Sequence, residues 1–289
     1  MSHGVKKIGI VGAGQMGGGI TQVAAVAGLD AVVYDSSKEQ LAKCRSLHEK
    51  LLGRAVTKER LTQSEADAAM ARINYADSLD ALAGADWVVE AIVENLDIKG
   101  DLFETLAAML TDERVVLASN TSSISITALA AKTGAAARRV VGMHFFNPVP
   151  VMKLVEVIQG LQTSDDVVAR TMALAEAMGK TPLKANDRAG FVSNRVLMPM
   201  INEAFYAWME GVAEPEAIDG VMKLGCNHPM GPLRLADFIG LDTCVHIMNV
   251  LYTELGAEKY APCPLLKQLV TAGRLGNKSG MGVYDYSTT

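Results

Sequence analysis

The opening of the chain combines a long charge-free run with a high density of glycine. Residues 8–29 carry no charged side chain, and seven of these 22 residues are glycines. An uncharged run of this length is also found in membrane spans. Here, however, a short apolar run, Lys7–Val11, is followed by a helical pattern over Gly17–Gly28. Since no basic segment with an A-x-A cleavage site accompanies it, we expect neither a membrane span nor a signal peptide.

A G-x-G-x-x-G pattern joins this predicted strand to the predicted helix. Its glycines are Gly12, Gly14 and Gly17, with Gln15 and Met16 between the last two. The first glycine permits a tight turn, the second lets the backbone approach a pyrophosphate, and the third allows close helix–strand packing. The pyrophosphate then lies at the helix N-terminus, where free N–H groups and the helix dipole favour an anion. The pattern therefore predicts a dinucleotide site.

An acidic residue follows at the distance that such a site requires. Asp35 lies 23 residues after Gly12, directly behind the predicted strand Ala31–Tyr34. An acid at this place binds the ribose hydroxyls of the dinucleotide. Because its carboxylate would repel a 2′-phosphate, we expect NAD rather than NADP as the cofactor, although the nearby Lys38 leaves the strictness of this choice open.

Apolar runs and helical patterns alternate through the first two thirds of the chain. Strands are expected at Lys7–Val11, Ala31–Tyr34, Trp87–Ala91, Val115–Ser119, Val140–His144, Leu154–Ile158 and Thr181–Leu183. Helices are expected at Gly17–Gly28, from Ser36, from Thr62, and at Leu96–Leu110, Ser125–Thr133 and Asp165–Met178. This alternation predicts an α/β fold: a Rossmann-type, doubly wound, mostly parallel sheet covered on both faces.

Two of the expected helices begin with a capping-box spacing. Ser36 precedes Glu39, and Thr62 precedes Glu65, by three residues. The helix that starts at Ser36 is expected to bury one side, made of Leu41, Cys44, Leu47 or His48, and Leu51.

The alternation of apolar runs and helical patterns ends near Lys184. From Gly190 onward the pattern is helical, with few β-branched runs. We therefore expect residues 1–186 to form the NAD-binding domain and residues 187–289 a smaller, all-helical domain. Pro199, inside the helical pattern Phe191–Glu210, should kink that helix or mark its first turn.

Charge and cysteine usage restrict partners and compartment. The 289 residues carry 27 basic and 32 acidic side chains, a net charge of −5, with neither half strongly polarised. We therefore expect no nucleic-acid or membrane partner. No residue is predicted to bind a metal. The four cysteines lie far apart without a C-x-x-C pair, which favours a cytoplasmic, soluble protein with buried thiols; they are Cys44, Cys226, Cys244 and Cys263.

Three segments carry polar residues where packing alone would favour apolar ones. Ser119–Ser123, read S-N-T-S-S, follows one predicted strand, and His144 ends another. Ligands of a doubly wound sheet gather at such strand ends. Glu156 lies inside the otherwise apolar strand Leu154–Ile158 and needs a partner if it is buried. His144 is the natural one, because a carboxylate fixes the tautomer of the ring and stabilises its protonated form.

Each of these residues also has a purely structural interpretation. A histidine beside two phenylalanines is often a packed core residue, and a strand glutamate often faces solvent. Ser122, Ser123 or Ser125 could cap the helix that follows. The basic residues Lys50 and Arg54, with Lys58, could meet phosphates or simply be solvated.

Taken together, the motifs resemble the short-chain L-3-hydroxyacyl-CoA dehydrogenases, most closely the bacterial 3-hydroxybutyryl-CoA dehydrogenases. The resemblance runs in order along nearly the whole chain. It is carried by Gly12–Gly17, Val88–Asn95, Ser119–Ser123, Gly142–Pro148, Lys153–Val157, Gly190–Arg195 and Gly276–Tyr284. It implies NAD-dependent hydride transfer that interconverts (S)-3-hydroxyacyl-CoA, 3-hydroxybutyryl-CoA in particular, and 3-oxoacyl-CoA.

The resemblance also implies roles for individual residues. His144 matches the general base and Glu156 the acid that orients it. Ser122 matches the hydroxyl that contacts the reacting oxygen, although counting back from His144 leaves Ser123 open. Asn194 matches the amide that holds the substrate across the cleft. The implied cofactor contacts are Asp35, Glu94, Lys99, Asn147 and Lys278, with Asn120 as a weaker candidate.

The resemblance further implies an acyl-CoA substrate and a homodimer or higher homo-oligomer, with the helical domain supplying one cleft wall and the dimer interface. Two other functions stay open. One is a related NAD dehydrogenase acting on a non-CoA hydroxy acid. The other is a non-catalytic, crystallin-like or NAD-sensing protein on the same fold.

Overall fold

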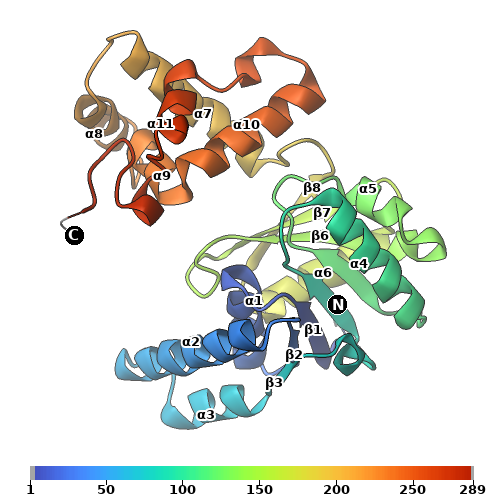
Figure 1. Cartoon of the computed structure of the whole chain (residues 1–289). Helices are drawn as coiled ribbons and strands as arrows, with labels where there is room; N and C mark the ends of the chain where they lie inside the picture. The colour runs from blue at the N-terminus through green and yellow to red at the C-terminus, as the bar shows by residue number, and fades with distance from the viewer. Residues whose placement is uncertain (1–3, 288–289) are drawn as a thin grey trace. The chain divides into compact units, whose positions relative to one another are not determined.

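The structure is a computed structural model, and it describes residues 4–287. The chain divides into two compact units, the first ending at Asp187 and the second beginning at Arg188. The sequence predicts a boundary after residue 186. Figure 1 shows the first unit in blue to yellow and the second in yellow-brown to red.

The first unit is built on a sheet of eight strands in the order β3-β2-β1-β4-β5-β6-β7-β8. The strands are β1 (Lys7–Val11), β2 (Asp30–Tyr34), β3 (Ile73–Ala76), β4 (Trp87–Glu90), β5 (Val116–Ser119), β6 (Val140–Phe145), β7 (Leu154–Gln159) and β8 (Thr181–Asn186). All neighbouring pairs are parallel except β6 and β7, which are antiparallel. The α/β, mostly parallel fold class is therefore confirmed.

Helices pack against this sheet because each buries one apolar side. They are α1 (Gln15–Val26), α2 (Lys38–Thr57), α3 (Gln63–Ala71), α4 (Leu96–Met109), α5 (Ile126–Ala131) and α6 (Asp165–Ala177), with short 3₁₀ turns η1 (Leu79–Leu82) and η2 (Gly134–Arg139). One core cluster joins α1 and α6 to alternate residues of the strands. Alternation along a strand sends the residues between them to the opposite face.

The strand β3 is missing from the sequence prediction. Its residues read Ile-Asn-Tyr-Ala, and only Ile73 is buried. It pairs with β2 alone, at the edge of the sheet. Strands are predicted from apolar runs or alternation, and an edge strand with one buried side chain has neither.

Helix α2 differs from its prediction in two details. Its N-cap is Ser37 rather than Ser36, and the Ser37 hydroxyl accepts the Gln40 N–H. The side chains that it buries are those of Leu41, Cys44, His48 and Leu52, so Leu51 is one position out of phase. The capping box of Thr62 and Glu65 is confirmed.

The helices and 3₁₀ turns are the only named elements in the described part of the second unit, residues 188–287, as the sequence predicts. It contains α7 (Ser193–Met209), α8 (Pro215–Gly225), α9 (Pro232–Ile239), α10 (Leu241–Leu255) and α11 (Pro264–Thr271), with 3₁₀ turns η3 (Glu258–Tyr260) and η4 (Asn277–Ser279). Pro199 lies inside α7, so the prediction that it marks the first turn is wrong. Cys226 is exposed while the other three thiols are buried, so the prediction of four buried thiols is wrong for that residue.

Among residues 4–287 no single helix is long and apolar enough to cross a bilayer, although α9 and α10, which bend by 97°, reach the required length and hydropathy as a pair.

At two positions in and after the turn between β1 and α1, only glycine fits. Gly12 has a φ of 104°, and a Cβ there would lie 2.5 Å from the Ala91 carbonyl oxygen. A Cβ at Gly17 would lie 1.8 Å from the Gly12 carbonyl oxygen. Gly14 differs, because its φ is −67° and a Cβ there would meet no atom within 4 Å. The fold thus requires glycine at positions 12 and 17. At position 14 it does not, and the space beside Gly14 is open.

This difference predicts unequal effects of two alanine substitutions. Gly17→Ala should lower the free energy of unfolding by about 2–3 kcal/mol or prevent folding, because the added methyl overlaps a backbone oxygen. Gly14→Ala should cost at most about 1 kcal/mol, the usual penalty for alanine at an N-cap. Urea unfolding followed by circular dichroism compares the two. Equal costs would contradict the steric assignment.

Candidate active site

The turn after β1 is held by an acidic side chain from the neighbouring strand. Asp35 Oδ2 accepts the Ala13 N–H at 2.9 Å, and Asp35 Oδ1 accepts the Ser37 N–H at 2.9 Å. The Gly12 N–H also donates to the Tyr34 carbonyl at 2.8 Å. The predicted ribose-binding acid therefore lies beside the glycine-rich turn.

The start of α1 fits an anionic group such as a pyrophosphate. Gly14 is its N-cap, and no side chain of the described residues caps it. The first-turn N–H groups of a helix have no partner within the helix. In front of them lies the space that a Cβ at Gly14 would enter without contact. Free donors, the helix dipole and open space together suit a dinucleotide phosphate.

Two amides connect this turn to the ends of the neighbouring strands. Gln15, the first residue of α1, donates from Nε2 to Asn147 Oδ1 at 3.0 Å, and Asn147 follows β6. Asn120, which follows β5, accepts the Phe145 N–H at 2.9 Å. Met16 is partly buried against the core of the sheet. The structure thus brings four of the predicted cofactor residues to one edge of the sheet, with Asn120 engaged by backbone.

His144 and Glu156 face each other across the antiparallel pair β6–β7. They are direct register partners, and His144 Nδ1 lies 2.8 Å from Glu156 Oε2. Both side chains are buried. Because a carboxylate only accepts hydrogen bonds, this contact places the proton of a neutral ring on Nδ1 and the lone pair on Nε2. The Phe146 ring lies 4.6 Å from the imidazole, centroid to centroid, and limits its rotation.

The S-N-T-S-S segment after β5 is wrapped around one carboxylate. Glu94 Oε1 accepts the Ser122 N–H at 3.0 Å and the Ser123 N–H at 3.1 Å, together with the hydroxyls of Thr121 at 2.6 Å and Ser123 at 2.9 Å. Ser122 Oγ is 3.4 Å from the same oxygen. Burial raises the pKa of Glu94, but the Lys99 ammonium and these hydrogen bonds outweigh it and bring the pKa below its usual value. Glu94 is therefore a carboxylate that organises the Ser122 loop.

Lys99 lies behind this loop rather than at its surface. Its side chain is 1% exposed, and its ammonium contacts Glu90 Oε1 at 2.5 Å, Glu94 Oε2 at 3.2 Å and the Ile92 carbonyl at 3.4 Å. The resemblance implies a cofactor contact for Lys99, and these contacts connect it to Glu94.

Glu90 is a buried acid to which the sequence gives no role. It ends β4 with 0% of its side chain exposed, and it accepts hydrogen bonds from Ser119 Oγ at 2.6 Å and the Ile92 N–H at 2.7 Å. The signal for it in the sequence is a carboxylate at the end of the apolar run Trp87–Val89, similar to the position of Glu156 inside an apolar strand.

Two predicted site residues belong to the second unit. Asn194 is buried in the first turn of α7. Lys278 lies in η4, and its ammonium is 2.6 Å from Asp242 Oδ1. Burial raises the pKa of Asp242, but hydrogen bonds from Lys278 and Thr243 and the Lys278 charge bring it below the usual value. The ion pair holds Lys278 toward the N-terminus of α10.

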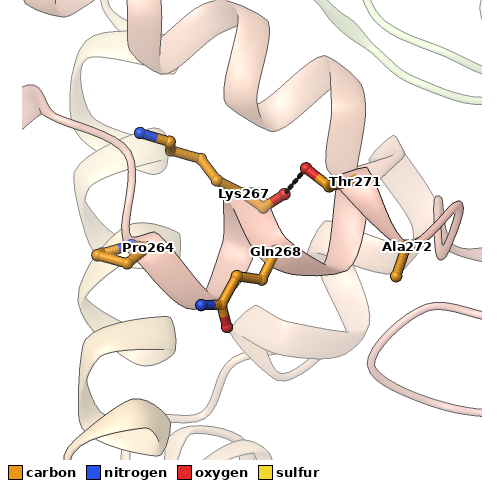
Figure 2. Close-up of a pocket in the computed structure, with 5 residues that line it drawn as sticks. All are labelled: Pro264, Lys267, Gln268, Thr271 and Ala272. Atoms are coloured by element: carbon orange, nitrogen blue, oxygen red, sulfur yellow. Dashed lines mark hydrogen bonds between the residues drawn. The ribbon is translucent and has the colours of Figure 1, made fainter.

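Other surface features offer less chemistry. A hollow of about 510 Å³ lies along α11, lined by Pro264, Lys267, Gln268, Thr271 and Ala272. Figure 2 shows these five side chains on the helix. Lys267 is the only charged residue that lines this hollow, and none of the predicted site residues lines it. In residues 4–287 no group of three or more His, Cys, Asp or Glu side chains is arranged to hold a metal ion. Lys50 and Arg54 of α2 are exposed, as is Lys58.

Comparison with known proteins covers both units. Residues 7–188 match the model of the 3-hydroxyacyl-CoA dehydrogenase NAD binding domain, and residues 190–286 match that of the 3-hydroxyacyl-CoA dehydrogenase C-terminal domain. A Deinococcus radiodurans protein named Probable 3-hydroxybutyryl-CoA dehydrogenase is 58% identical over 97% of this chain and 100% of its own. The 3-hydroxybutyryl-CoA dehydrogenase of Bradyrhizobium diazoefficiens is 49% identical over 99% and 97% of the two chains.

A solved structure shows the same arrangement of elements. The (S)-3-hydroxybutyryl-CoA dehydrogenase from Ralstonia eutropha superposes with a TM-score of 0.93 at 50% identity, over 98% of this chain and 100% of the other. Both family models and near-complete relatives agree with the motifs on which the resemblance rests. The chain belongs to the 3-hydroxyacyl-CoA dehydrogenase family.

Proposed function

We propose that the chain is an NAD-dependent dehydrogenase that interconverts (S)-3-hydroxyacyl-CoA and 3-oxoacyl-CoA, with 3-hydroxybutyryl-CoA and acetoacetyl-CoA as its substrate pair. The observation that carries this proposal is the buried pair of His144 and Glu156, 2.8 Å apart at the sheet edge that also holds the glycine-rich turn. Near-complete relatives named for the same substrate support the choice of acyl group.

His144 is the general base of the proposed reaction. Its Nε2 takes the proton of the 3-hydroxyl group during oxidation and returns it during reduction. Histidine is the side chain that most often transfers a proton to or from a reacting group in enzymes. Glu156 holds the ring through Nδ1 and stabilises the imidazolium by its negative charge. NAD, when bound, supplies the hydride acceptor.

The remaining proposed residues bind and orient. The Ser122 hydroxyl donates a hydrogen bond to the reacting oxygen, with Ser123 as the alternative donor, and the Asn194 amide holds the substrate. Such positioning contributes by keeping the reacting atoms at a short distance and in the correct orientation. On the cofactor side we assign the ribose to Asp35 and the pyrophosphate to the start of α1. Further contacts are assigned to Glu94, Asn120, Asn147, Lys278 and, through Glu94, Lys99.

The proposal is tested by mixing the purified protein with NADH and acetoacetyl-CoA and following absorbance at 340 nm. We expect oxidation of NADH that depends on the CoA ester and is much slower with free acetoacetate. Turnover with free acetoacetate alone would instead favour a non-CoA hydroxy-acid dehydrogenase. NADH binding without any turnover would favour a non-catalytic protein. A series of 3-hydroxyacyl-CoA chain lengths then gives the acyl preference.

Removal of the base gives a sharper prediction. His144→Gln should lower kcat by about 10²–10⁴-fold, because no group then exchanges the proton of the 3-hydroxyl. NADH binding, measured by its fluorescence, should stay within a few-fold of the original protein. Near-normal turnover would contradict the assigned base.

Glu156→Gln is the matched test of the orienting acid. Its amide keeps the shape and a hydrogen-bond acceptor, but it removes the charge that supports the imidazolium. We expect a fall in kcat of about tenfold or more, smaller than that of His144→Gln. Measured under the same conditions, a larger loss than that of His144→Gln would reverse the order of the two roles.

The cofactor preference is predicted to depend on Asp35. Asp35→Asn removes the charge that repels a 2′-phosphate, so the preference for NADH over NADPH, measured as the ratio of kcat/KM values, should fall by about tenfold. Asp30→Asn, at the exposed start of β2, the strand that Asp35 follows, serves as the control and should leave the ratio unchanged. An unchanged ratio in Asp35→Asn would remove Asp35 from the ribose site.

We further propose that the protein acts as a homodimer or larger homo-oligomer through its second unit. Three apolar side chains on and before α8 are exposed, those of Val212, Val221 and Leu224, the last with 89% of its surface accessible. Val221 and Leu224 are three residues apart on α8 and so share one side of the helix. Exposed apolar side chains that gather on one face mark interaction sites. Sedimentation velocity decides the point, and a single monomeric species would refute it.

We also propose that the protein works in the cytoplasm. All four cysteines are free, as is usual for proteins in a reducing compartment. Cell fractionation with an antibody to the protein tests this, and recovery in a secreted fraction would refute it.

A further inference from the structure

The buried charge of Glu90 has no part in the chemistry described so far, and that of Lys99 enters it only through Glu94. A carboxylate and an ammonium that are both almost fully buried must compensate each other. Their pairing by itself does not explain their place, because two apolar side chains of similar volume would fill the same space at less cost. Their contacts show where they act.

One set of contacts runs from Glu90 to the strand beside it. Glu90 Oε2 accepts the Ser119 hydroxyl at 2.6 Å, and Ser119 Oγ in turn accepts the Thr121 N–H at 3.1 Å. Ser119 ends β5, so the carboxylate fixes the first turn of the loop that carries Ser122.

A second set of contacts reaches the same loop through Lys99. Glu90 Oε1 contacts the Lys99 ammonium at 2.5 Å, and that ammonium lies 3.2 Å from Glu94 Oε2. The other oxygen of Glu94 accepts the N–H groups of Ser122 and Ser123. One oxygen of Glu94 thus contacts the buried ammonium, and the other binds the loop.

Resting on the proposed function, we propose that Glu90 is a positioning residue of the dehydrogenase. Through Ser119 on one side and the Lys99–Glu94 pair on the other, it holds the Ser122 hydroxyl where the reacting oxygen binds. Lys99 acts in the same way, as the bridge between the two carboxylates. Neither residue touches substrate, and each affects turnover through the loop of residues 119–123.

The geometry explains why two sets of contacts are needed. Thr121, Ser122 and Ser123 are consecutive, and a loop held at one end only would still rotate about its backbone. Ser119 holds the Thr121 N–H, while Glu94 holds the next two N–H groups. Both sets end on Glu90, so a change at this one residue loosens both.

Glu90→Gln tests the proposal with little change of shape. The amide cannot accept at both ends, and it leaves the Lys99 ammonium without its strongest partner. We expect kcat to fall by about 10- to 100-fold. The Kd of ADP-ribose, which probes the glycine-rich turn without the nicotinamide, should change by less than about threefold.

A double-mutant cycle with Ser122→Ala separates positioning from a general loss of structure. If Glu90 acts through Ser122, then Glu90→Gln should lower kcat by less than about threefold when Ser122 is already alanine. An equal fall in both backgrounds would overturn the proposal. Asp237→Asn is the control, because Asp237 is a buried carboxylate of the second unit that accepts backbone N–H groups of residues 283 and 284. Its effect should be the same in both backgrounds.

Amide hydrogen exchange provides a readout that needs no turnover. Glu90→Gln should speed exchange across residues 119–123 and leave that of β7 unchanged, and unchanged exchange in the loop would overturn the proposal. Should the wild-type protein not oxidise NADH with acetoacetyl-CoA, the proposed function fails, and exchange alone then decides whether Glu90 holds the loop.

A second variant covers the case in which Glu90→Gln does not fold. Ser119→Ala removes only the first set of contacts and should lower kcat by about 3- to 10-fold, again with little effect once Ser122 is alanine. Full activity in Ser119→Ala, or the same fall in both backgrounds, would overturn the proposal as well.

Discussion

Parallel pairing of β1, β4, β5 and β6 is the constraint on which the candidate site depends. Parallel strands end at the same edge, so residues that follow different strands become neighbours although they are far apart in the chain. The glycine-rich turn, Glu90, the Ser119 loop and the end of β6 meet in this way. The hydrogen bonds between Gln15 and Asn147 and between Asn120 and Phe145 are direct consequences of that shared edge.

One strand breaks the pattern, and the candidate base depends on it. Because β7 runs antiparallel to β6, Glu156 in the middle of β7 becomes the register partner of His144 near the end of β6. The connection between the two strands is held by Lys180, whose ammonium donates to the carbonyls of Val149 and Met152. Burial lowers the pKa of this lysine. The cost of its burial is offset by contacts that keep the connection in one shape.

Elements with a clear apolar periodicity and residues in recognisable motifs could be predicted from the sequence. Contacts that depend on how distant segments pack together could not. Strands with three or more apolar residues were found, whereas the edge strand with only Ile73 buried was not. The need of a buried Glu156 for a partner pointed to His144. Lys99 was different, because a lysine in the first turn of a helix is usually solvated, and only the folded chain shows that two carboxylates enclose it. The roles of Asn194 and Lys278 came from resemblance alone.

The placement of charge at the sheet edge follows a consistent logic. Glu90 and Lys99 are buried behind the Ser122 loop, with the partly exposed Glu94 beside them. Desolvation of the buried charges opposes folding, so stability alone does not account for them. Hydrogen bonds have direction, however, and apolar contacts do not. Glu90 uses both oxygens, and Glu94 does the same, so the loop has one arrangement that satisfies all of its donors. A loop that is already ordered loses little entropy when a substrate binds, and under the proposal made above this order orients the Ser122 hydroxyl toward the reacting oxygen.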